Sequence, residues 1–213
     1  MPLSSPAARE HIHTRTVTCQ GFRRADGLWD IEGHITDTKT YGFANNDRGE
    51  IPPGVPVHEM WLRVTVGDDL VIRAVEAVTD HAPFNACDAI APAYENLVGL
   101  KLGPGLRKQI RDRVGGIHGC THLTELMGPV ATTAFQTIFP IRSREAEEKR
   151  LAQLTSGDGS DPASDAAPNK RKMPLINTCH GWRSDGAAVK RIAPDFYTGD
   201  EPIDEDDDSL REL

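Results

Sequence analysis

The segment Leu28-Trp-Asp-Ile-Glu-Gly-His-Ile-Thr-Asp37 decides the fold class. From Trp29 onward its large apolar residues, Trp29, Ile31 and Ile35, fall in one phase of a two-residue period. This is the period of a half-buried β-strand. The turn pair Asp26-Gly27 precedes the segment, and an earlier alternating stretch covers Ile12–Cys19. Strands joined by so short a turn run antiparallel, because a parallel connection needs a dozen or more residues. The first part of the chain therefore predicts an antiparallel hairpin.

Two further stretches continue this pattern. Val57–Val66 alternates again, and the turn Gly67-Asp68-Asp69 leads from it directly into a fourth stretch, Leu70–Thr79. Residues Thr40–Pro56 are rich in Asn, Gly and Pro and are predicted to form a loop. The sequence thus predicts an antiparallel meander sheet of about four strands.

After the strands, the apolar period changes to that of helices. Helices are predicted for three stretches that begin at capping or turn residues: 88–99, 103–116 and 121–139. Pro129 should kink or divide the third helix, and Ser143–Arg150 has the composition of an exposed charged helix. About three helices that back the meander on one side make an α+β fold.

Composition divides the chain into four parts. They are an α+β core domain (1–150), a flexible linker rich in Gly, Ser, Asp, Ala and Pro (151–174), a C-terminal segment that docks on the core (175–199) and a disordered acidic tail (200–213). The net charge is −8, but the chain from Thr198 onward holds eight acidic residues and one arginine. The body of the protein is therefore close to neutral.

These features exclude several classes of protein. A nearly neutral body without a clustered basic face argues against nucleic-acid binding, and no apolar run approaches the ~18 residues of a membrane span. The N-terminus Met1-Pro-Leu-Ser-Ser-Pro6 lacks the basic flank and apolar stretch of a secretion signal, so we expect a cytoplasmic protein. There, the four cysteines are expected as thiols, ligands or small buried residues rather than disulfides. The oligomeric state stays open, and a homo-oligomer is compatible with the sequence.

The strongest local pattern is Gly115-Gly-Ile-His-Gly-Cys-Thr-His-Leu-Thr-Glu125. Its glycine-rich turn delivers Cys120 to the start of a helix, where free N–H groups and the helix dipole favour an anionic thiolate. Cys87 stands in the same setting, directly before the helix expected at Asp88. Both thiols are candidate nucleophiles or metal ligands, and the alternative is that each is a small buried residue beneath a tight turn. The flanking glycines also indicate a close approach of the backbone.

Histidines and carboxylates accompany these cysteines. His122 lies in the same motif and is a candidate metal ligand or base, or else a capping histidine. Glu125, near the start of the same predicted helix, is a candidate for moving protons. His58 and Glu59 open the third predicted strand as a candidate ligand and base, or else as a solvent-exposed pair at the strand edge.

Two arginines are candidates for holding an anionic substrate. Arg24 belongs to the charged turn of the first hairpin, and its guanidinium suits a carboxylate or phosphate; the alternative is an ordinary solvated charge. Arg183 ends Thr178-Cys-His-Gly-Trp-Arg183, which follows the linker. That segment is either a lid over a site or a strap that fills a groove.

The chain resembles a bacterial family of domains of unknown function that is marked by the motif GCTHLxEL. The resemblance rests on Asp26-Gly-x-Trp-Asp30, Asp37-x-Lys39, His58-x-Met60, Cys87, Leu97-Val-Gly99 and Gly119-Cys-Thr-His-Leu-Thr-Glu-Leu126. It covers roughly residues 10 to 140, and it implies no particular activity.

A more remote resemblance concerns the order of the elements. This order looks like that of the NifU/IscU iron–sulfur scaffold fold: three strands, then Cys87, a Leu-Val-Gly helix end, and Cys120 at a helix start. This resemblance implies an antiparallel sheet backed by helices, with cysteines and an acid binding an iron–sulfur cluster or zinc at one end. Cys87 and Cys120 match the second and third cysteines of the scaffold. The position of the first scaffold cysteine falls near His58-Glu59, where this chain has no cysteine. Gly119 replaces the histidine that precedes the last scaffold cysteine. It therefore implies a mixed site of His, Cys and carboxylate.

From these patterns we expect a metal-assisted enzyme, with Zn²⁺ or Fe²⁺ in a site that keeps an open coordination position. The reaction class is hydrolase or lyase chemistry on a small anionic organic acid, ester or phosphate in bacterial catabolism. The expected metal ligands are His58, Cys87, Cys120 and His122. Glu59 or Glu125 would transfer protons. Arg24 or Arg183 would bind the anionic group of the substrate.

Three alternatives stay open. A metal-free enzyme would use Cys120 as nucleophile and His122 as base. A non-enzymatic protein would carry an iron–sulfur cluster or a metal to a partner, and an interaction module would have an inert core. The expected site requires residues 58, 87 and 120 to meet at one pole of the fold.

Overall fold

The structure, a computed structural model, describes residues 3–155 and 175–200. The chain divides into two compact units, Met1–Ser156 and Gly157–Leu213, and each is described by itself. Most of the predicted linker, and the predicted acidic tail apart from Asp200, lie outside the described residues. No helix among the described residues is long and apolar enough to cross a membrane.

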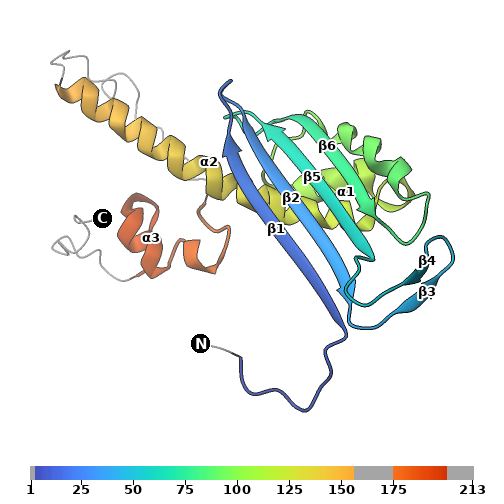
Figure 1. Cartoon of the computed structure of the whole chain (residues 1–213). Helices are drawn as coiled ribbons and strands as arrows, with labels where there is room; N and C mark the ends of the chain where they lie inside the picture. The colour runs from blue at the N-terminus through green and yellow to red at the C-terminus, as the bar shows by residue number, and fades with distance from the viewer. Residues whose placement is uncertain (1–2, 156–174, 201–213) are drawn as a thin grey trace. The chain divides into compact units, whose positions relative to one another are not determined.

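The first unit is built on a four-stranded antiparallel sheet (Figure 1). Its strands are β1 (His13–Arg23), β2 (Trp29–Lys39), β5 (His58–Val66) and β6 (Ile72–His81), and they are hydrogen-bonded in that order. β1 pairs with β2 without interruption from His13–Lys39 to Arg23–Trp29. The meander predicted from the two-residue period is therefore confirmed.

The predicted loop between the second and third main strands contains a small hairpin. β3 (Phe43–Asn45) pairs with β4 (Gly49–Ile51) as a separate two-stranded sheet. The side-chain oxygen of Asn45 accepts hydrogen bonds from the backbone N–H groups of Asp47 and Arg48, and Gly49 has a positive φ of 74°. The turn residues that indicated a loop serve a hairpin turn instead, so the prediction of a plain loop was wrong.

Helical elements back the sheet on one side. They are η1 (Asp88–Leu97), α1 (Leu106–Val114), η2 (Gly116–His118) and α2 (Thr121–Thr155). Figure 1 shows α1 and α2 behind the sheet, with α2 continuing past its edge. Apolar side chains of η1, α1 and α2 share one buried cluster with the sheet, including Tyr94, Ile110 and Leu126. The α+β architecture is therefore confirmed.

Two helix predictions need correction. The stretches 121–139 and 143–150 belong to the single helix α2, which Pro129 and Pro140 do not divide. Each proline removes only one backbone hydrogen bond, and the helix buries a long apolar stripe beside them. Asp88 is the first residue of the 3-10 helix η1 rather than its cap, because Cys87 occupies the N-cap position.

Close packing of α2 on the sheet depends on two glycines. A Cβ added to Gly33 in β2 would lie 2.7 Å from Cγ2 of Val130, and one added to Gly21 in β1 would overlap the side chain of Thr137. Both glycines face α2, in phase with the buried residues of β2. Their missing side chains set how closely α2 approaches the sheet.

The second unit contains three short helical elements among its described residues: η3 (His180–Trp182), α3 (Ala187–Ile192) and η4 (Pro194–Phe196). Val189 of α3 is fully buried. The side-chain oxygen of Asn177 accepts a hydrogen bond from the backbone N–H of Ser184 at 2.9 Å. The docking of residues 175–199 on the core stays a prediction.

Substitution of Gly33 tests this packing. Gly33→Ala should lower the free energy of unfolding by about 1–3 kcal/mol, because its Cβ overpacks against Val130 and Leu126. Gly128→Ala in α2 is the control, since a Cβ there meets nothing within 4 Å and alanine favours a helix. Urea unfolding of both variants measures the difference. Equal stability of the two variants would contradict the packing described here.

Candidate functional site

The site begins with three side chains that lie in one row across the sheet. The register pairs Arg15 of β1 with Asp37 of β2, and Asp37 with His58 of β5. Residues directly opposite each other on antiparallel strands point to the same face. Asp37 continues the buried phase of β2, so the whole row points to the face that the helices cover.

Asp37 is the centre of this row. Its side chain is only 4% exposed, and its Oδ1 and Oδ2 accept hydrogen bonds of 2.9 Å each from Nε and Nη2 of Arg15. Nε2 of His13 lies 2.9 Å from Oδ1, and Nδ1 of His58 lies 3.2 Å from Oδ2. Burial works to raise the pKa of Asp37, but Arg15, His58 and His13 together hold that pKa below its ordinary value. Asp37 is therefore a buried, ionised carboxylate.

The start of α2 brings a second set of groups over the row. Nε2 of His122 lies 3.8 Å from Oδ2 of Asp37, and the rings of His122 and His58 have centroids 3.8 Å apart. Glu125, on the next turn of the helix, accepts a hydrogen bond of 2.9 Å from Nη1 of Arg15. Arg15 therefore joins the sheet to the helix through two carboxylates.

The backbone before α2 is held by close packing and by a buried hydroxyl. A Cβ on Gly119 would overlap the carbonyl oxygen of Val114, so the close approach expected for these glycines is present. The hydroxyl of Tyr94, a fully buried residue of η1, lies 3.0 Å from the N–H and 2.7 Å from the carbonyl oxygen of Cys120. It also lies 2.7 Å from Oγ1 of Thr124. Tyr94 thereby fixes the first turn of the helix that carries His122.

The two site histidines favour their neutral forms. Burial lowers the pKa of His58 below its ordinary value, and the neighbouring His122 lowers it further. Burial also lowers the pKa of His122, with a further contribution from Arg15. A neutral imidazole is the form that binds a metal or accepts a proton.

These residues include one group with the composition of a metal site. One ligand atom each from Asp37, His58 and His122 lies within 4.8 Å of the others. Among residues 3–155 and 175–200, this is the one group of three or more His, Cys, Asp or Glu side chains close enough to share a metal ion. Two imidazoles and one carboxylate form a donor set used by catalytic zinc and by non-haem iron. Sequence patterns indicated the two histidines as metal ligands but gave Asp37 no role.

Cys120 lies beside this group without being a member of it. Its Sγ is 3.9 Å from Nδ1 of His122 and 3.8 Å from Sδ of Met60. His122 thus has the thiol near one ring nitrogen and Asp37 near the other. A thiol, an imidazole and a carboxylate in this order can also serve nucleophilic catalysis.

Glu59 points to the opposite face of the sheet from its neighbour His58. Its Oε1 lies 3.1 Å from Nε2 of His34, and its Oε2 lies 3.7 Å from Nε2 of His81. The ring of His34 stacks on Trp61 with centroids 3.6 Å apart. Because successive strand residues face opposite sides, β5 separates Glu59 from the row that contains Asp37.

The other candidates lie apart from this group. Cys87 is half-buried at the start of η1 and belongs to no such group in the described part of the chain. Arg24 bonds Asp26 and Asp30 beside the β1–β2 turn, about nine residues or roughly 30 Å along β1 from Arg15. Arg183 belongs to the second unit, where it makes two 2.7 Å bonds to Asp185.

Removal of the Tyr94 hydroxyl tests how the start of α2 is held. Tyr94→Phe keeps the buried ring but leaves polar groups of Cys120 and Thr124 without this partner, so the free energy of unfolding should fall by about 1–3 kcal/mol. Urea denaturation measures the loss. Tyr41→Phe at an exposed position is the control and should change stability little. A loss no larger than that of the control would show that the hydroxyl does not brace the helix.

The buried histidines predict a dependence of stability on pH. The unfolded chain binds protons to these imidazoles near their ordinary pKa of 6.5, whereas the folded protein does so only at lower pH. The free energy of unfolding should therefore fall as the pH drops below about 6.5. Denaturation between pH 7.5 and pH 5, with a chelator present, measures this slope. The double variant His58→Gln/His122→Gln should flatten it, and an unchanged slope would contradict the assignment.

Comparison with known proteins identifies a family but no activity. No curated protein and no solved structure matches the chain. A family model described as "Protein of unknown function (DUF2889)" matches residues 13–136. The match runs from the first residue of β1 into α2, so it includes Arg15, Asp37, His58, Cys120 and His122 and leaves out the second unit. The chain therefore belongs to the DUF2889 family.

Proposed function

We propose that the protein is a metal-assisted enzyme of the hydrolase or lyase class that acts on a small anionic organic acid, ester or phosphate. The observation that carries this proposal is the convergence of Asp37, His58 and His122 from two strands and a helix, with one ligand atom of each within 4.8 Å of the others. Zn²⁺ or Fe²⁺ would supply a Lewis acid that activates water or polarises a carbonyl or phosphoryl oxygen. Cytoplasmic location and a role in catabolism are part of the same proposal.

The donor set suits such an ion. His58 and His122 are biased toward the neutral form that binds metals, and Asp37 is biased toward its ionised form. Arg15 already bonds both oxygens of Asp37, which reduces the negative charge offered to a cation. Each carboxylate oxygen can interact with more than one partner, so Arg15 would act as an orienting partner of the ligand.

A bound metal ion would add positive charge at the site, so this proposal keeps an anionic substrate. Arg15 and His13 are the partly exposed cationic or titratable groups of β1 beside Asp37, with side chains 37% and 46% exposed. In this proposal they replace Arg24 and Arg183 as the groups that first meet an anion. Glu125 remains a candidate for proton transfer, since its side chain is 57% exposed and contacts Arg15.

The test is metal binding by the full chain and by matched variants. Wild-type protein should bind about one equivalent of Zn²⁺ or Fe²⁺, and Asp37→Asn, His58→Gln and His122→Gln should each weaken binding at least roughly tenfold. Glu59→Gln is the control, because this residue lies on the other face of the sheet. Elemental analysis and competition with a chromogenic chelator give the affinities. Absence of binding, or equal loss in the control, would overturn the proposal.

One contact favours a second candidate, a thiol-dependent enzyme with Cys120 as nucleophile and His122 as base. The contact is the 3.9 Å approach of Sγ to Nδ1. Cys120→Ser separates the two candidates, because the metal-binding group would stay intact while a thiol nucleophile would be lost. The carrier alternative and the NifU/IscU likeness rest on cysteine ligands, and they are less favoured because the converging donors are nitrogen and oxygen.

A further inference from the structure

Within the described residues of the first unit, β1 is a long and regular edge of the main sheet that no other segment covers. All eleven of its residues pair with β2, and no other strand among the described residues pairs with it. Ten of the eleven are exposed, and only Cys19 is half-buried. The outer N–H and C=O groups of such a strand are ready to pair with another chain.

The opposite edge of the sheet is treated differently. Beyond β6, the backbone of Ile72 bonds to Gly99 and Leu100, and Leu102 bonds to Leu70. The segment between η1 and α1 therefore covers the start of that edge. β1 has no comparable cover in the described part of the unit.

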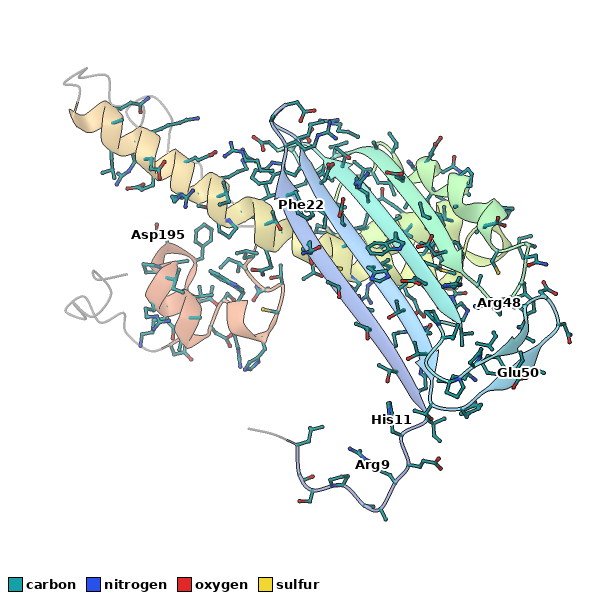
Figure 2. The ribbon with its side chains drawn as sticks, viewed as in Figure 1. Arg9, His11, Phe22, Arg48, Glu50 and Asp195 are labelled. Atoms are coloured by element: carbon teal, nitrogen blue, oxygen red, sulfur yellow. The ribbon has the colours of Figure 1, made fainter. Side chains whose placement is uncertain are left out.

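β1 also lacks three of the usual devices that block edge pairing, namely proline, lysine and a β-bulge, and its only formal charges are two arginines. Its sequence, His13-Thr-Arg-Thr-Val-Thr-Cys-Gln-Gly-Phe-Arg23, contains no proline and no lysine, and its register with β2 has no bulge. Its two arginines are held over the helix-covered face, Arg15 by Asp37 and Glu125 and Arg23 by Glu145. Two exposed apolar side chains, Val17 and Phe22, line the strand, and Figure 2 shows Phe22 near the end of β1 that lies away from His11.

We propose that β1 pairs antiparallel with β1 of a second copy of this chain, so that two sheets join into one of eight strands. Pairing centred on Thr18 uses all eleven residues and would form about ten backbone hydrogen bonds. It places Val17 opposite Cys19 and Arg15 opposite Gly21, which has no side chain. Centring on Cys19 would set Arg15 against Arg23, and like charges directly opposite are destabilising.

This register makes Thr18 its own partner across the two-fold axis. Thr18 lies on the open face of the sheet, opposite His34, and it is exposed. The outward row around it is uncharged, with Thr14, Thr16 and Gln20 as neighbours on the same face. A charge introduced at position 18 would therefore face its own copy at the centre of the interface.

The inference does not depend on the proposed metal chemistry, although both involve β1. His13 and Arg15 belong to β1, so the partner's Arg23 and Gly21 would lie beside them. Formation of the dimer would cover the outer side of this strand without using Asp37, His58 or His122.

The experiment tests charge complementation in the full chain. Light scattering and sedimentation measure the molar mass of the protein at about 1–200 μM, because dimer formation depends on concentration. Wild type should be a dimer at the upper concentrations. Thr18→Lys and Thr18→Glu should each raise the dissociation constant at least about tenfold, because like charges face each other. An equimolar mixture of the two variants should restore the dimer.

Val78→Lys on β6 is the matched control, since it adds the same charge on the same open face at the other edge and should leave the dimer intact. A second variant, Thr18→Cys, should form a disulfide-linked dimer on oxidation. Thr16→Cys should form much less of this dimer, because position 16 faces Gln20 of the partner copy. A monomeric wild type at all concentrations would overturn the proposal. Dimers unaffected by Thr18→Lys, or no rescue on mixing, would overturn it as well.

Discussion

The ion pair between Arg15 and Asp37 is the interaction on which the candidate site depends. A buried carboxylate without a partner is strongly unfavourable, and removing one member of a buried pair leaves the other uncompensated. Here both oxygens of Asp37 accept bonds from one planar guanidinium, which fixes the direction of the carboxylate as well as its charge. The third donor nitrogen of that guanidinium bonds Glu125, so the same side chain ties the sheet to α2.

The position of α2 decides what else reaches Asp37. Gly33 lets the helix lie close to β2, and Gly119 lets the chain before it approach the end of α1. Tyr94 then holds the first turn through its hydroxyl. These contacts place His122 next to His58 and Cys120 next to His122. The geometry of the site therefore depends on packing at Gly33, Gly119 and Tyr94, three residues that are not themselves candidate reactive groups.

Sequence patterns predicted much of the fold, because the two-residue period of a half-buried strand is a local property. They failed where the outcome depends on packing across distance. Turn residues at 45–49 indicated a loop but form a hairpin turn, and Pro129, which indicated a kink or a division of the helix, does not divide α2. At the site, His58 and His122 were found as candidate ligands from their motifs, whereas Asp37 and Arg15 received no role.

One signal for Asp37 was present: it stands in the phase of Trp29, Ile31 and Ile35, so a charged residue occupies a core position of β2. The sequence by itself determined the four main strands, their antiparallel order and the glycine-rich start of α2, since each follows from neighbouring residues. Only the tertiary structure decided that Arg15, Asp37 and His58 share a row, that Glu59 lies on the other face, and that Cys87 is outside the group. Those relations depend on strand register and helix placement. Both are set by many weak contacts between residues that are far apart in the chain.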